Sequence, residues 1–266
     1  MDFQRTEAAL RQSYGQMAAK YRSDDEIEVT SAHHQRLAAR LGAVSASFER
    51  PISVLDVGCG TGRFFYSLSN VDRLVGMDIS PEMLQAAKQP VNANRITARN
   101  IQLIQGNVFF ASFPPRSFDL IYSFGMFGHG CPLTREVCDK LHSWLVPGGQ
   151  VYFDTVDIAG LPWWDRTKKQ VRKALYPGLP QKVRNILDQR EHDTPFFGMT
   201  RRELEDILRS SRFSSFAVIS KVCESPLWQG RHLECRACVS GFTATAPASI
   251  PPGVATPSTK PELVGP

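Results

Sequence analysis

Apolar residues recur at two spacings along the chain, and the alternation predicts helices and strands in turn. Residues 4–22 and 28–47 carry apolar side chains at roughly helical spacing. Short apolar runs predict five strands, over 52–57, 74–78, 101–105, 118–124 and 148–155. Helices are expected between them, over 63–69, from Pro81 with Ser80 as its N-cap, and over 133–145. Because strands that alternate with helices form parallel sheets, this order predicts a Rossmann-like, three-layer α/β sandwich.

The alternation changes after the fifth strand. Residues 157–198 hold two short helical patterns and predict a helical lid inserted into the domain. A helix with a capping box, Thr200 to Glu203, follows it. Two strands over 213–222 and 232–242 have no helix between them, so they should pair as an antiparallel hairpin. The sequence therefore predicts a mostly parallel, seven-stranded sheet with a terminal antiparallel hairpin.

Length and composition favour one domain. The 266 residues are 42% hydrophobic, which is enough for a sizeable core. We expect this domain over 1–243, with N-terminal helices over 1–50. Residues 244–266 hold a third of the chain's 18 prolines, and we expect a disordered tail there.

Charge and cysteine content limit the classes of function only weakly. The net charge of +5 argues neither for nor against nucleic acid. No apolar run of signal-peptide or membrane-spanning type is present, so we expect a cytoplasmic protein with reduced thiols. Cys235 and Cys238 fall in a predicted strand, where inert thiols are favoured over a metal or redox site. We therefore predict no metal centre.

The most informative residues follow the first predicted strand. Asp56 stands near its end, and the next residues form a glycine-rich turn: Gly58, Cys59, Gly60 and Gly62. Glycines let the backbone approach a ligand closely, and such folds bind nucleotides at the carboxyl ends of strands. A dinucleotide fingerprint needs a further glycine where this chain has Arg63, and Asp56 would repel a pyrophosphate. S-adenosylmethionine, with its ammonium and sulfonium, fits this turn better.

Further cofactor contacts are expected after the next two strands. Asp78 follows Asp56 at about the 20-residue offset at which an acid binds a ribose diol, although an ordinary helix-entry acid is an alternative. Ile79 is placed to pack on an adenine face. Asn107 and Val108 follow the third strand, where an amide can pair with the adenine edge.

Over residues 52–155 the chain resembles class I S-adenosylmethionine-dependent methyltransferases, in particular the group that includes ubiquinone/menaquinone-biosynthesis enzymes. Four blocks carry the resemblance: VLDVGCGTGRF, VGMDISPEML, SFDLIYSFGMFGH and LVPGGQVYFDT. It implies that the glycines and Asp56 hold the methionine end, Asp78 the ribose, and Asn107 and Val108 the adenine. It also places three residues along the flank of the cofactor: Ser123, Phe124 and Gly125.

Two details refine the resemblance. Residues 14–21 are similar to a Y-x-x-x-A-x-x-Y segment that closes over the cofactor in relatives, which implies contacts from Tyr14 and Tyr21. Relatives usually have Asp where this chain has Asn107. The amide oxygen of Asn107 can still accept from an exocyclic amine, so we expect binding to survive.

Two residues are candidate catalytic bases. His129 lies just past the fourth strand, beside the expected methyl group, and its alternative role is to brace the loop 125–130. Asp154 lies at the end of the fifth strand, and its alternative role is a cap or a salt bridge.

The leading hypothesis is methyl transfer to a small apolar or aromatic molecule beneath the lid 157–198. The basic side chains of that insertion also suit a peripheral contact with an anionic membrane, or RNA. RNA is disfavoured because Ser123-Phe124-Gly125-Met126 stands where an N-P-P-Y-type tetrad would mark base methylation. A non-catalytic protein that binds S-adenosylmethionine is a further alternative. The acceptor atom and the oligomeric state are left open.

Overall fold

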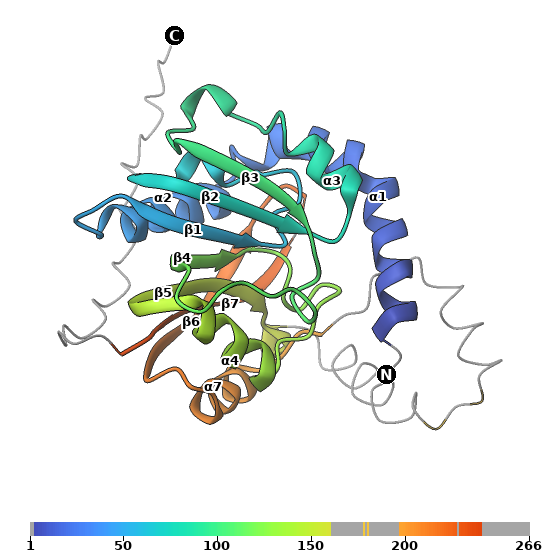
Figure 1. Cartoon of the computed structure of the whole chain (residues 1–266). Coiled ribbons are helices and arrows are strands. Elements are labelled where there is room, and N and C mark those ends of the chain that lie inside the picture. The colour runs from blue at the N-terminus through green and yellow to red at the C-terminus, as the bar shows by residue number, and fades with distance from the viewer. Residues whose placement is uncertain (1–2, 161–177, 179, 181–196, 228, 241–266) are drawn as a thin grey trace, which may run out of the picture.

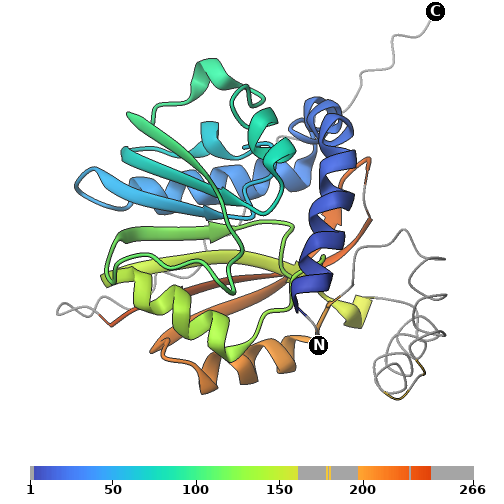
Figure 2. The same cartoon turned by 45° about the vertical axis from the view of Figure 1, so that its right-hand side comes forward.

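The computed structural model confirms a seven-stranded sheet with helices on both faces (Figures 1 and 2). It describes residues 3–160, 178, 180, 197–227 and 229–240. The strands are β1 (Ile52–Val57), β2 (Val71–Asp78), β3 (Asn100–Gln105), β4 (Phe118–Ser123), β5 (Leu145–Val156), β6 (Ser215–Glu224) and β7 (Gln229–Cys238). Their order in the sheet is β3-β2-β1-β4-β5-β7-β6. Strand β7 runs antiparallel to both neighbours and the other pairs are parallel, as the sequence predicted.

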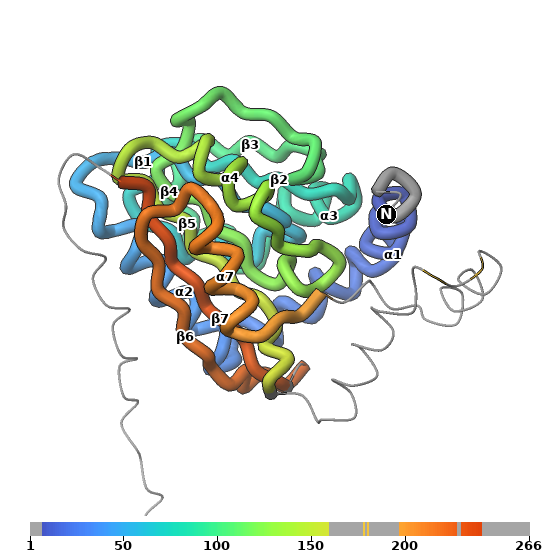
Figure 3. The backbone as a smooth tube through the Cα atoms, turned by 90° about the horizontal axis from the view of Figure 1, so that it is seen from below, coloured from blue at the N-terminus to red at the C-terminus, as the bar shows by residue number. Residues whose placement is uncertain are grey.

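Two apolar clusters sandwich the sheet. The helices are α1 (Phe3–Glu28), α2 (Ala32–Ala46), α3 (Pro81–Ala86), α4 (Arg135–Trp144) and α7 (Arg201–Ser210). Helices α4 and α7 cover one face of the sheet (Figure 3). Their Leu141 and Leu204 are buried in one of the two clusters. Helix α2 covers the other face through Leu37 and Leu41. Helix α1 lies across the carboxyl ends of β1 and β2, next to α3 (Figure 1).

The helix predicted over 63–69 is absent, because only a single 3-10 turn, Phe65–Ser67, follows the glycines. The side chain of Ser67 donates to the carbonyl of Phe64, and the backbone amide of Ser69 donates to Ser45 Oγ. Such bonds compete with helical ones. Asn70 then takes a left-handed backbone conformation, φ 57°, and β2 begins immediately after it. The second strand therefore starts three residues earlier than predicted.

Other boundaries shift for local reasons. The break between the first two helices falls after Glu28, and α2 starts at Ala32 because the Ser31 side chain accepts from the amide of His34. Strand β5 starts at Leu145, because residues 146–149 form an irregularity within the β4–β5 ladder instead of a turn before it. The predicted caps of α3 and α7, Ser80 and Thr200, are confirmed.

The predicted lid and tail fall mostly outside the described residues. The described ends of the insertion meet at the carboxyl end of β5, where Met199 donates to the carbonyl of Val156 and Ile158 donates to that of Met199. The amide of Phe197 donates to the carbonyl of Gly128, 2.8 Å away. The insertion therefore leaves and rejoins the domain beside the loop that follows β4. None of the helices in the described part of the chain is long and apolar enough to cross a membrane.

Candidate functional site

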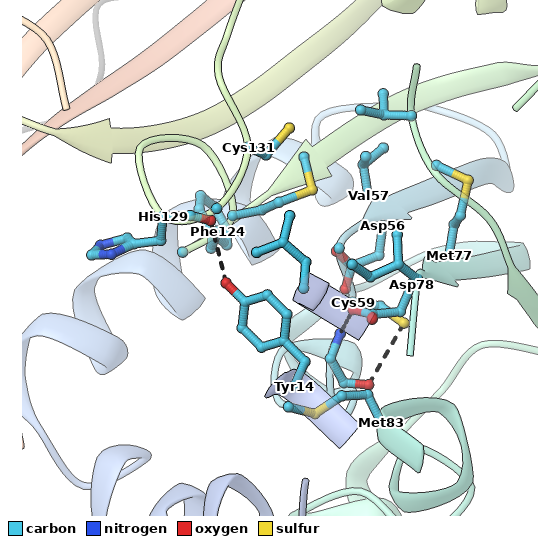
Figure 4. A pocket seen from close by; sticks show the side chains of 18 of the residues that line it. Tyr14, Asp56, Val57, Cys59, Met77, Asp78, Met83, Phe124, His129 and Cys131 are labelled. Atoms are coloured by element: carbon cyan, nitrogen blue, oxygen red, sulfur yellow. Dashed lines mark hydrogen bonds between the residues drawn. The ribbon is translucent and has the colours of Figure 1, made fainter. Parts of the chain in front are cut away.

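A pocket opens where the carboxyl ends of β1 to β4 meet the underside of α1 (Figure 4). Most of its lining comes from five short segments of the chain. They are Asp56–Phe64 without Gly62, Met77–Ile79, Gly106–Phe109, Phe124–Met126 and His129–Pro132, and Met83 and Phe197 add to them. Helix α1 closes the pocket with Glu7, Leu10, Tyr14, Tyr21 and Asp25. The pocket therefore lies at the strand ends where the sequence predicted the cofactor.

The glycine turn brings bare backbone to the pocket. Gly58, Gly60 and Gly62 all have φ between 52° and 76°, a region that side chains disfavour. A Cβ on Gly58 would lie 2.6 Å from the sulfur of Met126, whereas a Cβ on Gly60 would meet nothing within 4 Å. Gly60 therefore borders open space at the pocket. Gly62 does not line the pocket, and its Cα lies against the ring of Phe65.

Asp56 lies at the floor of the pocket, almost fully buried. Burial raises the pKa of its carboxyl to about 8. The hydrogen bond with Tyr122 and the charge of Arg63 lower this pKa, whereas the charge of Asp78 raises it. A cation placed beside this carboxyl would favour its ionised form. The site therefore favours a ligand that brings positive charge to Asp56.

Asp78 joins β2 to the glycine turn. One carboxylate oxygen accepts from the amide of Gly60 and the other accepts from that of Ser80, both at 2.9 Å. Burial raises the pKa of Asp78, and these backbone bonds lower it. Because a carboxylate offers about four lone-pair sites, Asp78 keeps acceptor capacity toward the pocket.

Helix α1 is fixed over the pocket by side chains of its own. The Tyr14 hydroxyl donates to the carbonyl of His129, 3.3 Å away (Figure 4). Further along α1, Asp25 accepts from the hydroxyl of Thr61 and lies 3.4 Å from the guanidinium of Arg63. Sequence reasoning pointed to Tyr14 and Tyr21, and both line the pocket. It missed Asp25, because no local pattern links an α1 acid to a turn 36 residues away.

The loop after β3 carries a second contact with α1. The Asn107 side-chain oxygen accepts from the amide of Phe109 at 3.0 Å, and its side-chain nitrogen donates to Glu7 at 2.9 Å. Asn107, Val108 and Glu7 all line the pocket. Glu7 was not foreseen from the sequence.

The two candidate bases occupy different positions. His129 lines the pocket, whereas Asp154 does not. One oxygen of Asp154 accepts from the amide of Gly125 at 2.7 Å, and the other lies 2.6 Å from His232 Nδ1. Burial alone would raise the pKa of Asp154, but His232 and these bonds hold it below its usual value. The hydroxyl of Ser123 is likewise turned away, because it donates to the carbonyl of Val57.

Asp154 also belongs to a buried trio with His33 and His232, whose potential ligand atoms lie within 4.8 Å of one another. Two imidazoles and a carboxylate can bind a transition metal. Here, however, Arg36 Nη2 lies 3.0 Å from His33 Nδ1, and a guanidinium only donates. Burial, with a smaller effect of His232, lowers the pKa of His33 to about 4, so neutral His33 carries its proton on Nε2. Neither ring nitrogen of His33 then offers a free lone pair to a metal, because Nδ1 accepts from Arg36 and Nε2 carries the proton, which favours a hydrogen-bonded network over a metal site.

Comparison with known proteins relates part of this chain to methyltransferases. Residues 54–149 match the model of a family described as a methyltransferase domain. An uncharacterized protein of Methanocaldococcus jannaschii is 29% identical over 189 residues, 65% of this chain and 66% of that protein. A demethylmenaquinone methyltransferase of Lactococcus lactis is 29% identical over 135 residues, 48% of this chain and 51% of that protein. The chain thus spans between half and two thirds of these relatives.

The fold is also that of solved methyltransferases. Magnesium protoporphyrin IX methyltransferase of Synechocystis, crystallised with bound SAH, superposes with a TM-score of 0.51 at 17% identity. The superposition covers 78% of this chain and 84% of the other. At this identity the similarity extends to the fold alone.

Proposed function

We propose that this chain, whose residues 54–149 match the model of a methyltransferase-domain family, is an S-adenosylmethionine-dependent methyltransferase with a small-molecule acceptor. One observation carries the proposal. A buried carboxyl, Asp56, lies under a turn whose Gly60 has open space before it, and Asp78 stands at the next strand end. This arrangement suits a ligand with a cationic amino-acid end and a ribose, because positive charge beside Asp56 stabilises its ionised form.

The residues present fit that cofactor along its whole length. Asp56 and the amides of the glycine turn would hold the methionine end, and Asp78 would accept from the ribose hydroxyls. Ile79 and Val108 would flank the adenine. When bound, the cofactor supplies a methyl group on a sulfonium, which is a good leaving group.

The remaining wall of the pocket would hold the acceptor. It is mostly apolar, with Leu10, Tyr14, Met126 and Phe197 beside His129. A small apolar or aromatic molecule fits such a wall, because apolar lining with a few polar groups is typical of small-molecule sites. The relative from L. lactis acts, by its name, on demethylmenaquinone. For the acceptor of this chain we propose only the class, a small molecule.

His129 is the residue best placed to take a proton from the acceptor. It lines the pocket and its loop is fixed by the bond from Tyr14 to the His129 carbonyl. The acceptor atom would form its bond to the methyl carbon as the carbon–sulfur bond breaks, and the imidazole would receive the acceptor's proton. Asp154 would act only on backbone and on His232, which removes it from direct contact with the acceptor.

Calorimetry tests the cofactor assignment. We expect the protein to bind S-adenosylmethionine and its product S-adenosylhomocysteine, and not NAD. Binding of NAD without either adenosyl ligand would refute the proposal.

A second experiment tests the acceptor class. The protein is incubated with methyl-labelled S-adenosylmethionine and a cell extract, and the label is separated into small-molecule, RNA and protein fractions. We expect label in the small-molecule fraction, reduced at least tenfold by His129→Gln. Label confined to RNA would establish the RNA methyltransferase alternative. Tight cofactor binding without transfer to any fraction would support the non-catalytic alternative.

A further inference from the structure

We infer that Glu7 of helix α1, paired with Asn107, is the residue that selects adenine over other purines in the cofactor site. This inference rests on the proposed function, because it concerns which base the nucleoside end of the pocket accepts. It assigns to α1 a hydrogen-bonding role that the glycine turn and Asp78 do not supply.

The first step is the fixed orientation of Asn107. Its side-chain oxygen accepts from the amide of Phe109, two residues on, at 3.0 Å. This bond is a local turn that a free Asn or Asp adopts readily. It directs the side-chain nitrogen of Asn107 away from its own loop. At this position, where most relatives have a hydrogen-bond acceptor, the side chain of Asn107 therefore presents a donor.

The second step is the partner of that donor. Asn107 Nδ2 donates to Glu7 Oε2, at 2.9 Å, and both residues line the pocket. A carboxylate only accepts hydrogen bonds, and each oxygen has room for more than one. The Glu7–Asn107 pair thus offers an acceptor and a donor side by side at the pocket wall. One bond between the two uses only part of the capacity of each group.

The third step is the complementarity to adenine. The base carries its exocyclic amine, a donor, next to ring nitrogens that accept. Glu7 would accept from the amine and the second N–H of Asn107 would donate to a ring nitrogen. Ile79 and Val108 supply the apolar walls against which a flat ring packs. A 6-oxopurine reverses this pattern, because it places an oxygen where Glu7 needs a donor.

Binding of S-adenosylhomocysteine and of its 6-oxo analogue, S-inosylhomocysteine, tests the inference without any turnover. In the unaltered protein we expect the adenosyl ligand to bind at least tenfold more tightly, since a mispaired, half-buried carboxylate costs affinity. Glu7→Gln should weaken adenosyl binding and reduce that preference by about tenfold, because the amide has one acceptor oxygen fewer for the amine and can donate to the 6-oxo group. Glu26→Gln is the matched control. Glu26 is an exposed acid of the same helix, bonded to Arg22 and outside this pocket.

A swap of the two groups provides a second test. Asn107→Asp in the Glu7→Gln background moves the carboxylate from α1 to the loop after β3. We expect this double variant to regain adenosyl affinity to within about threefold of the unaltered protein, because the acceptor returns beside the donor. Failure of the swap to regain any affinity would contradict the assigned geometry.

The outcomes separate this inference from the proposed function. If the folded protein binds neither ligand, the proposed cofactor is wrong. If it binds the adenosyl ligand but Glu7→Gln keeps the original preference, the role of Glu7 is wrong and the cofactor assignment stands. Thermal unfolding of each variant, compared with Glu26→Gln, shows whether a loss of binding reflects a loss of fold.

Discussion

At the residue scale, Gly60 allows backbone strain and ligand exclusion to be measured separately. It has φ 52° and open space before it, so Gly60→Ala meets no protein atom. We expect this change to lower the free energy of unfolding by about 1 to 2 kcal/mol, the cost of a left-handed non-glycine residue. The new methyl group would project into the pocket, so S-adenosylhomocysteine binding should fall by at least tenfold in calorimetry.

Gly148 is the matched control for that change. It has φ 78°, its Cβ would also meet nothing within 4 Å, and it lies outside the pocket. Gly148→Ala should destabilise the fold by a similar amount and leave binding intact. Equal binding by the two variants would show that the ligand does not lie against Gly60.

The raised pKa of Asp56 predicts proton release on cofactor binding. With a pKa of about 8, most Asp56 carboxyls are neutral at pH 7 before binding. An incoming ammonium favours the ionised form, so binding should release close to one proton at pH 7. Calorimetry in buffers of different ionisation enthalpy measures this number. Asp56→Asn should release none and bind at least tenfold more weakly, whereas proton-neutral binding by the unaltered protein would remove Asp56 from the contact.

At the element scale, helix α2 docks on the sheet through a buried polar network. Glu234 of β7 is fully buried and pairs with Arg40, with Arg36 at 3.5 Å and the Tyr152 hydroxyl at 3.1 Å. Such a network fixes how the helix meets the sheet, because a buried charge left without its partner is costly. It lies on the β5–β7 side of the sheet, away from the pocket.

Removing the Arg40 side of this network alone should cost more stability than removing the charges of both Arg40 and Glu234. Arg40→Met leaves the Glu234 carboxylate buried without its main partner, and we expect a loss of about 3 to 5 kcal/mol in urea unfolding at pH 7. Adding Glu234→Gln removes the buried charge and retains an acceptor for Tyr152, so the double variant should regain at least half of that loss. Since no member of this network lines the pocket, cofactor affinity per folded molecule should stay unchanged. A double variant less stable than Arg40→Met would show that the charge of Glu234 has another stabilising partner.

The elements were predictable from sequence where local pattern decides them. The run 52–57, the Ser80 cap and the Thr200 capping box all depend on neighbours in the chain, and each was confirmed. The helix expected over 63–69 failed because its serines bond to backbone carbonyls and to α2, which periodicity does not register.

The site was predictable on the side of the sheet and only in part on the side of α1, where Tyr14 and Tyr21 were foreseen and Glu7 was not. Asp56 and Asp78 lie at the ends of β1 and β2, Asn107 follows β3, and parallel topology brings these strand ends to one edge. Glu7 reaches its partner Asn107 across 100 residues of chain, a contact set only by the packing of α1. The same limit applies to Asp154, whose position at a strand end was foreseen but whose bonds to Gly125 and His232 were not.

At the scale of the whole molecule, two sets of buried groups oppose each other as pH changes. At the pocket, burial raises the pKa values of three carboxyls: Asp25, Asp56 and Asp78. At pH values between the unfolded and the folded pKa of each carboxyl, the folded protein therefore binds a proton that the unfolded chain has lost. The contribution of these carboxyls to the free energy of unfolding falls as pH rises through that interval. On α2, burial lowers the pKa values of His33 and His34, to about 4 and about 3. The contribution of these histidines to the free energy of unfolding therefore falls as pH falls.

His34 allows the second contribution to be isolated. Its ring stacks on Phe64 at 4.4 Å between centroids and its Nε2 lies 2.8 Å from the Tyr66 hydroxyl, so it is held neutral in the fold. Below pH 6.5 the unfolded chain protonates this histidine and the folded protein does not, so stability is lost as pH falls, by at most about 1.4 kcal/mol per pH unit. His34→Gln removes the titration but keeps a hydrogen-bonding side chain. Urea unfolding from pH 7 to pH 5 should therefore show the unaltered protein losing about 1 to 2 kcal/mol relative to this variant. Parallel pH profiles for the two proteins would mean that His34 becomes protonated within the folded structure, and that α2 does not exclude water from it.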